Sequence, residues 1–220
     1  MEAEKRHKYE MILARCHEVR FLSHLDFMRA ISRMLRRTGL PIYFSEGFNP
    51  KPKVSYMTPP LSTGHTSECE RVIFSLMRQM DLSDVSNKIE KMLPHGYKLI
   101  ELNVIEENQP KATAPDAVEY YVFVRKGAER YEFPQDAERT EVAGKILMRV
   151  PTIEERMGLK IFSEMNVTED FLGEFSECHV FLLPSGAEFK KPEAAVCPEL
   201  RCGKEDLYFH RMQEKSGIFT

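Results

Sequence analysis

The spacing of apolar and polar positions divides the first 105 residues into segments of two kinds. Short runs rich in Val, Ile, Phe and Tyr predict β-strands, whereas apolar residues three or four positions apart predict helices. In chain order the segments are strand 8–16, helix 24–38, strand 40–45, strand 69–77, helix 82–93 and strand 97–105. This β-α-β-β-α-β order is that of the ferredoxin-like fold, so the sequence predicts an α+β protein.

The second half of the chain predicts a degenerate copy of the same unit. A polar segment with two prolines, residues 106–117, indicates a linker between a first module at 1–105 and a second at 118–220. Residues 128–142 are charged and predict little regular structure, so the first helix of this module is expected to be reduced or lost. The remaining elements are strands 119–126, 144–150, 158–165, 178–184 and 205–211 and a helix at 191–200. We therefore expect two ferredoxin-like modules side by side.

The first predicted helix carries capping signals at both ends. Ser23 can accept a hydrogen bond at the N-terminus, and Asp26 three residues later completes an arrangement like a capping box. Gly39 stands where helices commonly end in the left-handed conformation, and Pro41 prevents continuation. In the second predicted helix, Ser83 is the expected cap.

Four arginines gather on one face of the first helix. At about 100° per residue, they lie opposite an apolar side formed by Phe27, Met28, Ile31, Met34 and Leu35. The planar guanidinium group suits phosphate oxygens and stacks on bases. We therefore predict that phosphate is contacted by Arg29, Arg33, Arg36 and Arg37. The alternative is that these arginines pair with acids elsewhere in the fold or only keep the protein soluble.

A proline-rich loop that is stiff and basic is predicted from Gly47 to Pro60, after the predicted strand 40–45. Gly47 permits a positive φ, and two prolines hold the chain extended. Phe48 lies beside two lysines, a combination that can stack a base and neutralise its phosphate. The predicted nucleic-acid-binding set therefore also includes Tyr43, Phe48, Asn49, Lys51, Lys53 and Tyr56. The alternative is a rigid lid over the sheet, with Phe48 as a plug in the core.

Charge sets this region apart from the rest of the chain. Residues 15–53 contain eight Lys or Arg and three Asp or Glu, whereas the whole protein has a net charge of −3. Residues 1–105 have a net charge of +4 and residues 106–220 a net charge of −7. A basic region on an acidic background favours a polyanionic partner, and we expect RNA rather than DNA.

Composition narrows the remaining function classes. Hydrophobic residues make up 42% and charged residues 30%, which is typical of a globular protein with a packed core. No apolar run approaches the roughly 20 residues that span a bilayer, and the sequence begins without an apolar leader, so we expect a cytoplasmic protein with no membrane association. The five cysteines are scattered, which predicts reduced thiols. Cys197 and Cys202, with Cys178 and His179, are too loosely spaced to predict a metal site.

His24 falls in the first turn of the arginine-bearing helix, on its core-facing side. A helix N-terminus disfavours the charged imidazolium, so a neutral ring able to act as a base is one interpretation. The other is a hydrogen-bonded histidine that anchors the helix to a neighbouring strand.

The segment RFLSHLDFMRAISRMLRRTGLPIYFSEGFNPKPKVSYMTPPLSTGHTSECE, residues 20–70, resembles the opening of a radical-SAM-linked family of bacterial proteins. The resemblance extends to YKLIELNVIEENQPKATAPDAVEYYVFV and FLLPSGAEFKKPE, while residues 128–160 look shortened. It implies a radical SAM protein as partner, and work on RNA or the translation apparatus. This chain lacks three closely spaced cysteines for an iron–sulfur cluster, so we expect it to bind no cofactor and the partner to carry any radical chemistry.

Three functions are compatible with these features. The leading hypothesis is a non-catalytic RNA-recognition module that presents substrate to the radical SAM enzyme. The predicted paired modules also resemble CRISPR RNA-processing endoribonucleases, which would make His24 the base and Lys51 or a tyrosine the group that stabilises the scissile phosphate. Those enzymes usually carry a glycine-rich loop near the C-terminus, and here only Gly186, Gly203 and Gly217 occur late in the chain. The third hypothesis is a protein–protein adaptor, whose arginine face meets an acidic patch on the partner.

Overall fold

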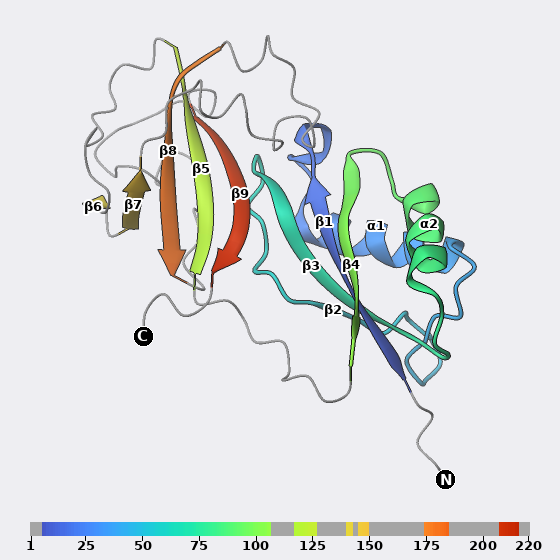
Figure 1. Ribbon diagram of the computed structural model, residues 1–220. Coiled ribbons are helices and arrows are strands. Elements are labelled where there is room, and N and C mark those ends of the chain that lie inside the picture. Colours follow the sequence, from blue (N-terminus) through green and yellow to red (C-terminus); the bar gives the residue numbers. More distant parts are fainter. Residues whose placement is uncertain are drawn as a thin grey trace.

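The computed structural model describes residues 6–106, 117–126, 140–142, 145–149, 174–184 and 207–215 (Figure 1). Two α-helices occur in these ranges: α1 (His24–Arg37) and α2 (Leu82–Met92). A 3-10 turn, η1 (His17–Val19), precedes α1. The strands are β1 (His7–Arg15), β2 (Val54–Tyr56), β3 (Thr66–Leu76), β4 (Tyr97–Ile105), β5 (Ala117–Arg125), β6 (Thr140–Val142), β7 (Lys145–Arg149), β8 (Phe175–Pro184) and β9 (Leu207–Lys215).

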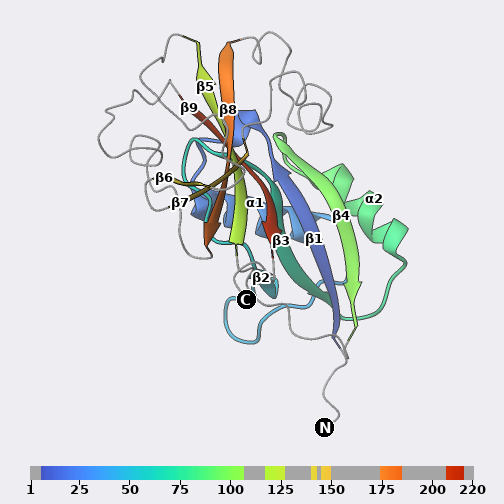
Figure 2. The same cartoon turned by 60° about the vertical axis from the view of Figure 1, so that its left-hand side comes forward.

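The fold is α+β, with the described strands joined in one mixed sheet. The strand order is β4-β1-β3-β9-β5-β8-β7-β6, and β2 pairs with β3 outside this path. The pairing of β3 with β9 is parallel, whereas β1 runs antiparallel to both β3 and β4. Figure 2 shows β9 and β5 continuing the sheet beyond β3. Segments from the two halves of the sequence therefore share one hydrogen-bonded sheet.

Alternation along β1 and β3 builds the core of the first half. In β1 the residues Tyr9, Met11 and Leu13 are fully buried, and Val72 and Phe74 in β3 face the same cluster. Both helices pack on this face and contribute Phe27, Ile31, Met34, Leu35, Val85 and Ile89. Among the described residues, neither helix is long and apolar enough to cross a bilayer.

The predicted ends of α1 are confirmed, and the predicted cap of α2 is corrected. The Asp26 amide donates to Ser23 Oγ at 3.2 Å, and Gly39 after the helix has φ +67°. In α2 the cap is Asp81, whose Oδ1 accepts from the amide of Ser83 at 2.9 Å, so Ser83 lies inside the helix. Asp and Ser cap helices about equally well, which leaves the sequence ambiguous at this boundary.

The predicted strand 40–45 was wrong, and the predicted proline-rich loop contains a strand instead. Ile42 and Phe44 make only isolated bridges, to Leu76 and Pro52. The ladder resumes at β2, within the segment predicted as a loop. Proline lacks an amide donor and interrupts a ladder, whereas the proline-free Val-Ser-Tyr of β2 can sustain one.

Gly96 fixes the turn between α2 and β4. It has φ +82°, and a Cβ added there would lie 2.5 Å from a methyl carbon of Val19 in η1. Its carbonyl also accepts from the amide of Cys16 at 2.9 Å. This close approach of two backbones holds the end of β1 against the start of β4.

Predicted strands of the second half correspond to β5, β7, β8 and β9, each within three residues at the start and four at the end. β6 falls in the segment where little regular structure was expected. The predicted strand 158–165, the helix 191–200 and most of the linker lie outside the described residues.

Candidate functional site

The four predicted arginines of α1 all have exposed side chains, on the side of the helix opposite its buried residues. Arg29 forms an ion pair with Asp26, 3.3 Å between Arg29 Nη1 and Asp26 Oδ1, and both side chains are largely exposed. A pair this exposed adds little to stability and can exchange for another anion. Within the part of the chain that the structure describes, Arg33 and Arg37 have neither an ion pair nor a hydrogen-bonded side-chain partner.

Residues 43–53 form a short hairpin, called here the cationic hairpin. The Lys53 amide donates to the Tyr43 carbonyl and the Ser45 amide to the Lys51 carbonyl, both at 2.8 Å. The hairpin is tied to β3 by the Tyr43 amide, which donates to the Ser75 carbonyl at 2.8 Å. Gly47 at the tip has φ +120°, a conformation that favours glycine.

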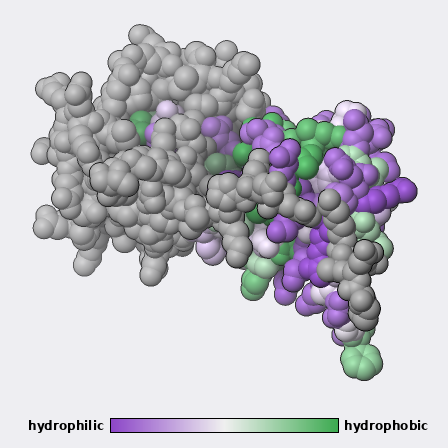
Figure 3. Space-filling view, turned by 60° about the horizontal axis from the view of Figure 1, so that its bottom comes forward, coloured by the Kyte–Doolittle hydropathy of each residue, from purple (hydrophilic) through white to green (hydrophobic). Residues whose placement is uncertain are grey.

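One side chain joins the arginine face to the cationic hairpin. Arg36 Nη2 donates to the Pro50 carbonyl at 2.9 Å, and the guanidinium carbon lies 5.7 Å from the centre of the Phe44 ring. Asn49, Lys51 and Lys53 are exposed on this hairpin. The predicted cations of the helix and of the loop are therefore neighbours. Figure 3 shows hydrophilic residues over much of the coloured surface when the molecule is viewed from below Figure 1.

The three predicted aromatic residues differ in their surroundings. Phe48 at the hairpin tip is fully exposed, so it is not a core plug. Tyr43 is half-buried, with the guanidinium of Arg6 4.2 Å above its ring. Tyr56 is also half-buried, and its hydroxyl donates to the Met28 carbonyl of α1 at 3.1 Å. Phe48 is thus the predicted ring that the protein itself leaves open to a ligand.

His24 begins α1 and faces inward. Its half-buried ring lies 6.0 Å from that of Phe27 and 5.9 Å from that of Tyr56. Burial lowers the pKa of His24. Lys51 lies at the opposite end of α1, because its neighbour Pro50 contacts Arg36, about 18 Å along the helix axis from His24. The structure therefore does not bring Lys51 to His24, whereas the tyrosine ring of Tyr56 lies beside His24.

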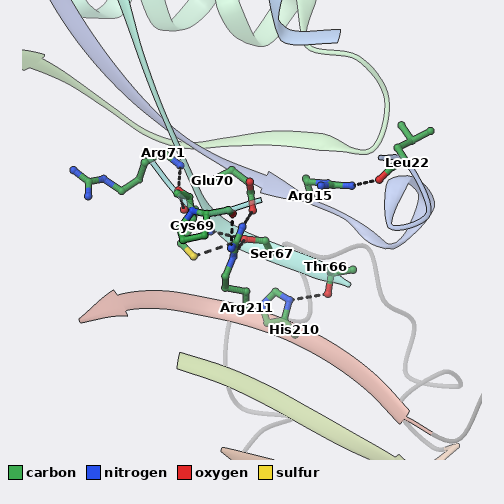
Figure 4. Close-up of polar contacts among 11 residues, drawn as sticks. Arg15, Leu22, Thr66, Ser67, Cys69, Glu70, Arg71, His210 and Arg211 are labelled. Atoms are coloured by element: carbon green, nitrogen blue, oxygen red, sulfur yellow. Dashed lines mark hydrogen bonds and ion pairs between the residues drawn. The ribbon is translucent and has the colours of Figure 1, made fainter. Parts of the chain in front are cut away.

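A second cluster, which the sequence did not predict, crosses the sheet beneath the start of α1. Cross-strand pairing aligns Tyr97 in β4, Arg15 in β1, Ser67 in β3 and Arg211 in β9. Residues opposite one another on paired strands project to the same face. We call these four residues the polar row; Figure 4 shows Arg15, Ser67 and Arg211 together with Glu70.

Glu70 and Arg211 form an ion pair inside the protein. Arg211 Nη2 donates to Glu70 Oε1, its Nη1 donates to the Pro59 carbonyl at 2.9 Å, and its Nε reaches Ser67 Oγ at 3.4 Å. Arg211 is fully buried and Glu70 nearly so. Burial alone would lower the pKa of Arg211, but the Glu70 carboxylate raises it above its ordinary value. Next to this pair, Thr66 Oγ1 contacts His210 Nδ1 at 2.8 Å.

The described residues contain no group of three or more His, Cys, Asp or Glu side chains placed to hold a metal ion. Cys16, Cys69 and Cys178 are buried and take part in no disulfide within these residues. Burial raises the pKa of Cys16 to about 11. Cys197 and Cys202 lie outside the described residues.

Comparison with known proteins places the chain in a bacterial family. No curated protein matches it significantly. Residues 8–160 match the family model described as "Uncharacterized protein conserved in bacteria (DUF2344)". The matched range includes α1, the cationic hairpin, and Arg15, Glu70 and Tyr97, whereas Arg211 lies beyond it. Since the match covers more than half of the sequence, the chain belongs to the DUF2344 family.

Proposed function

We propose that this protein is a non-catalytic RNA-binding accessory module that presents its substrate to a radical SAM enzyme. The observation that carries the RNA-binding part is the contact between Arg36 and Pro50, which unites the arginine face and the cationic hairpin. The radical SAM partner rests on the sequence resemblance of residues 20–70.

The chemistry of this surface fits a nucleic-acid backbone. It presents six cations, Arg29, Arg33, Arg36, Arg37, Lys51 and Lys53, against the acids Asp26 and Glu46. Guanidinium groups bind phosphate oxygens through paired N–H donors. The exposed ring of Phe48 at the tip can stack on an unpaired base, which is worth about 1–3 kcal/mol per base in single-strand binding.

Element order supports an interpretation of the first half as a ferredoxin-like module. The strands β1 to β4 have the order β4-β1-β3-β2 with antiparallel neighbours, and a helix follows β1 and β3. We interpret residues 118–220 as a second, degenerate module, attached through the pairing of β9 with β3. In this arrangement the RNA would meet α1 and the hairpin, not the open face of the sheet.

Salt-dependent binding tests the proposal directly. Fluorescence anisotropy with a labelled structured RNA is measured for the wild type, for Arg33→Gln/Arg37→Gln, and for Lys88→Gln/Lys91→Gln on α2 as a control with equal charge loss. Each lost phosphate contact lowers the slope of log K against log salt by about 0.7–0.9. The arginine variant should therefore lose about 1.4–1.8 in slope and bind about 25- to 60-fold more weakly at 0.1 M salt.

Two further variants separate stacking from charge. Phe48→Ala should weaken binding about tenfold without changing the salt slope, whereas Phe48→Tyr should retain the affinity. Equal binding by the arginine variant and the lysine control would contradict the proposal.

Pull-down of cellular partners before and after nuclease treatment examines the adaptor alternative: contacts that survive nuclease but are lost in Arg33→Gln/Arg37→Gln would favour a protein partner.

A further inference from the structure

The polar row contains two arginines, Arg15 and Arg211. Every side-chain nitrogen of Arg211 has a hydrogen-bond partner, whereas two of the three in Arg15 have none among the described residues. Arg15 is equally buried, but only its Nη2 has one, the Leu22 carbonyl at 2.6 Å. Among the described residues, Arg15 Nε and Nη1 are buried with no hydrogen-bond partner. Buried polar atoms in native proteins are nearly always satisfied, so these donors indicate a missing partner.

Two other residues that neighbour Phe27, as Arg15 does, also carry a buried polar atom without a hydrogen-bond partner among the described residues. Tyr97 is the cross-strand neighbour of Arg15, and its buried hydroxyl has no hydrogen-bond partner within the described ranges. The same holds for Nδ1 of His24 at the start of α1. Phe27 connects the three: its ring centre lies 5.6 Å from the Arg15 guanidinium carbon, 5.7 Å from the Tyr97 ring and 6.0 Å from the His24 ring.

Among the described residues, the buried charges on Arg15, Glu70 and Arg211 do not balance. Arg15 and Arg211 bring two positive charges, and Glu70 brings one negative charge. Glu70 is held by Arg211, so Arg15 feels it only at longer range. An uncompensated buried charge costs several kcal/mol. A bound anion would supply the missing charge and accept from the unsatisfied donors together.

We propose that Arg15, Tyr97 and His24 form a binding site for a small oxyanion, a free carboxylate or phosphate or one carried by a small molecule. Arginine suits such groups because its planar N–H donors match their oxygens. Phe27 and the edge of Tyr56 form an aromatic wall beside the site. The burial of Arg15 excludes a polymer, so this site is separate from the exposed RNA-binding surface and does not depend on it.

Thermal unfolding and calorimetric titration test this proposal. The full chain is titrated with sodium phosphate and, in a second series, sodium acetate, each at constant ionic strength set with sodium chloride. Saturable binding to the wild type, with a rise in Tm, is expected for at least one anion. Binding of phosphate alone, acetate alone or both identifies the class of oxyanion.

Variants assign the effect to Arg15. Arg15→Met leaves Glu70 and Arg211 as a balanced pair, so it should fold and lose the anion-dependent rise in Tm. Tyr97→Phe keeps the ring and should lower the affinity for the anion about tenfold or more. This variant also tests the proposal if Arg15→Met fails to fold. Arg33→Gln/Arg37→Gln should retain the full response, because its arginines lie on the surface. The proposal is overturned if neither anion binds the wild type, or if Arg15→Met and Tyr97→Phe respond as the wild type does.

Discussion

Replacing Glu70 by glutamine would isolate the effect of charge inside the sheet. Glutamine keeps the shape of glutamate and an oxygen that can accept from Arg211, but it removes the negative charge that pairs with this arginine. Breaking a buried ion pair by removing one charge typically costs about 3–5 kcal/mol. For a chain of this length we expect Tm to fall by about 6–20 °C.

A matched control shares strand β3 with the buried pair. Glu10 in β1 pairs with Arg71 in β3 at 2.7 Å, but the two side chains are 15% and 22% exposed. Solvent reaches this pair but not the Glu70–Arg211 pair, so Glu10→Gln should cost less than Glu70→Gln, about 1–2 kcal/mol. Urea unfolding followed by circular dichroism at pH 7 gives both free energies of unfolding.

A second arm examines whether charge or geometry causes the loss. Adding Arg15→Met to Glu70→Gln removes one of two uncompensated guanidinium groups, so the double variant should recover part of the lost stability. The reasoning is refuted if Glu70→Gln costs no more than Glu10→Gln. A further loss of stability in the double variant would refute the charge argument specifically.

Three more predictions follow from local features. Gly96→Ala should destabilise by about 3 kcal/mol, combining strain at positive φ with a clash, whereas Gly39→Ala, which has open space, should cost only about 1–2 kcal/mol; urea unfolding compares them. Because burial lowers the pKa of His24, the unfolded chain binds this proton more readily, so its contribution is complete above pH of about 6.5 and is lost as pH falls below that value. His24→Gln should flatten this loss of stability as pH falls below about 6.5, measured by urea unfolding at each pH. Cys16, with a pKa of about 11, should resist iodoacetamide at pH 8 until the protein unfolds, as judged by peptide mass spectrometry.

Local signals in the sequence identified most of the first half. Caps and apolar spacing placed α1 because Ser23 and Gly39 act through neighbouring backbone groups. The exposed arginines could be assigned for the same reason, since a helix fixes which residues share a face. The strand pairing within residues 40–56 could not be predicted in this way. It depends on which prolines lie at positions where the sheet needs no amide donor, and this is known only from the pairing itself.

The polar row is formed by pairing between distant segments, so the sequence could predict only part of it. Arg15 continues the alternation of buried positions in β1, and Glu70 continues that in β3. Two residues of opposite charge therefore occupy positions whose side chains face the core. That both side chains point into the core could have been predicted from this alternation. The role of Arg211 could not, because it needs the parallel pairing of β9 with β3 across more than 140 residues of chain.

That parallel pairing has a thermodynamic consequence for the oxyanion site. When β9 leaves β3, Arg15 and Glu70 remain as one cation and one anion that can neutralise each other. When β9 docks, Arg211 takes the carboxylate and Arg15 gains affinity for an external anion. By linkage the dependence is mutual, so a ligand held by Arg15 would tighten the attachment of a strand that it does not touch.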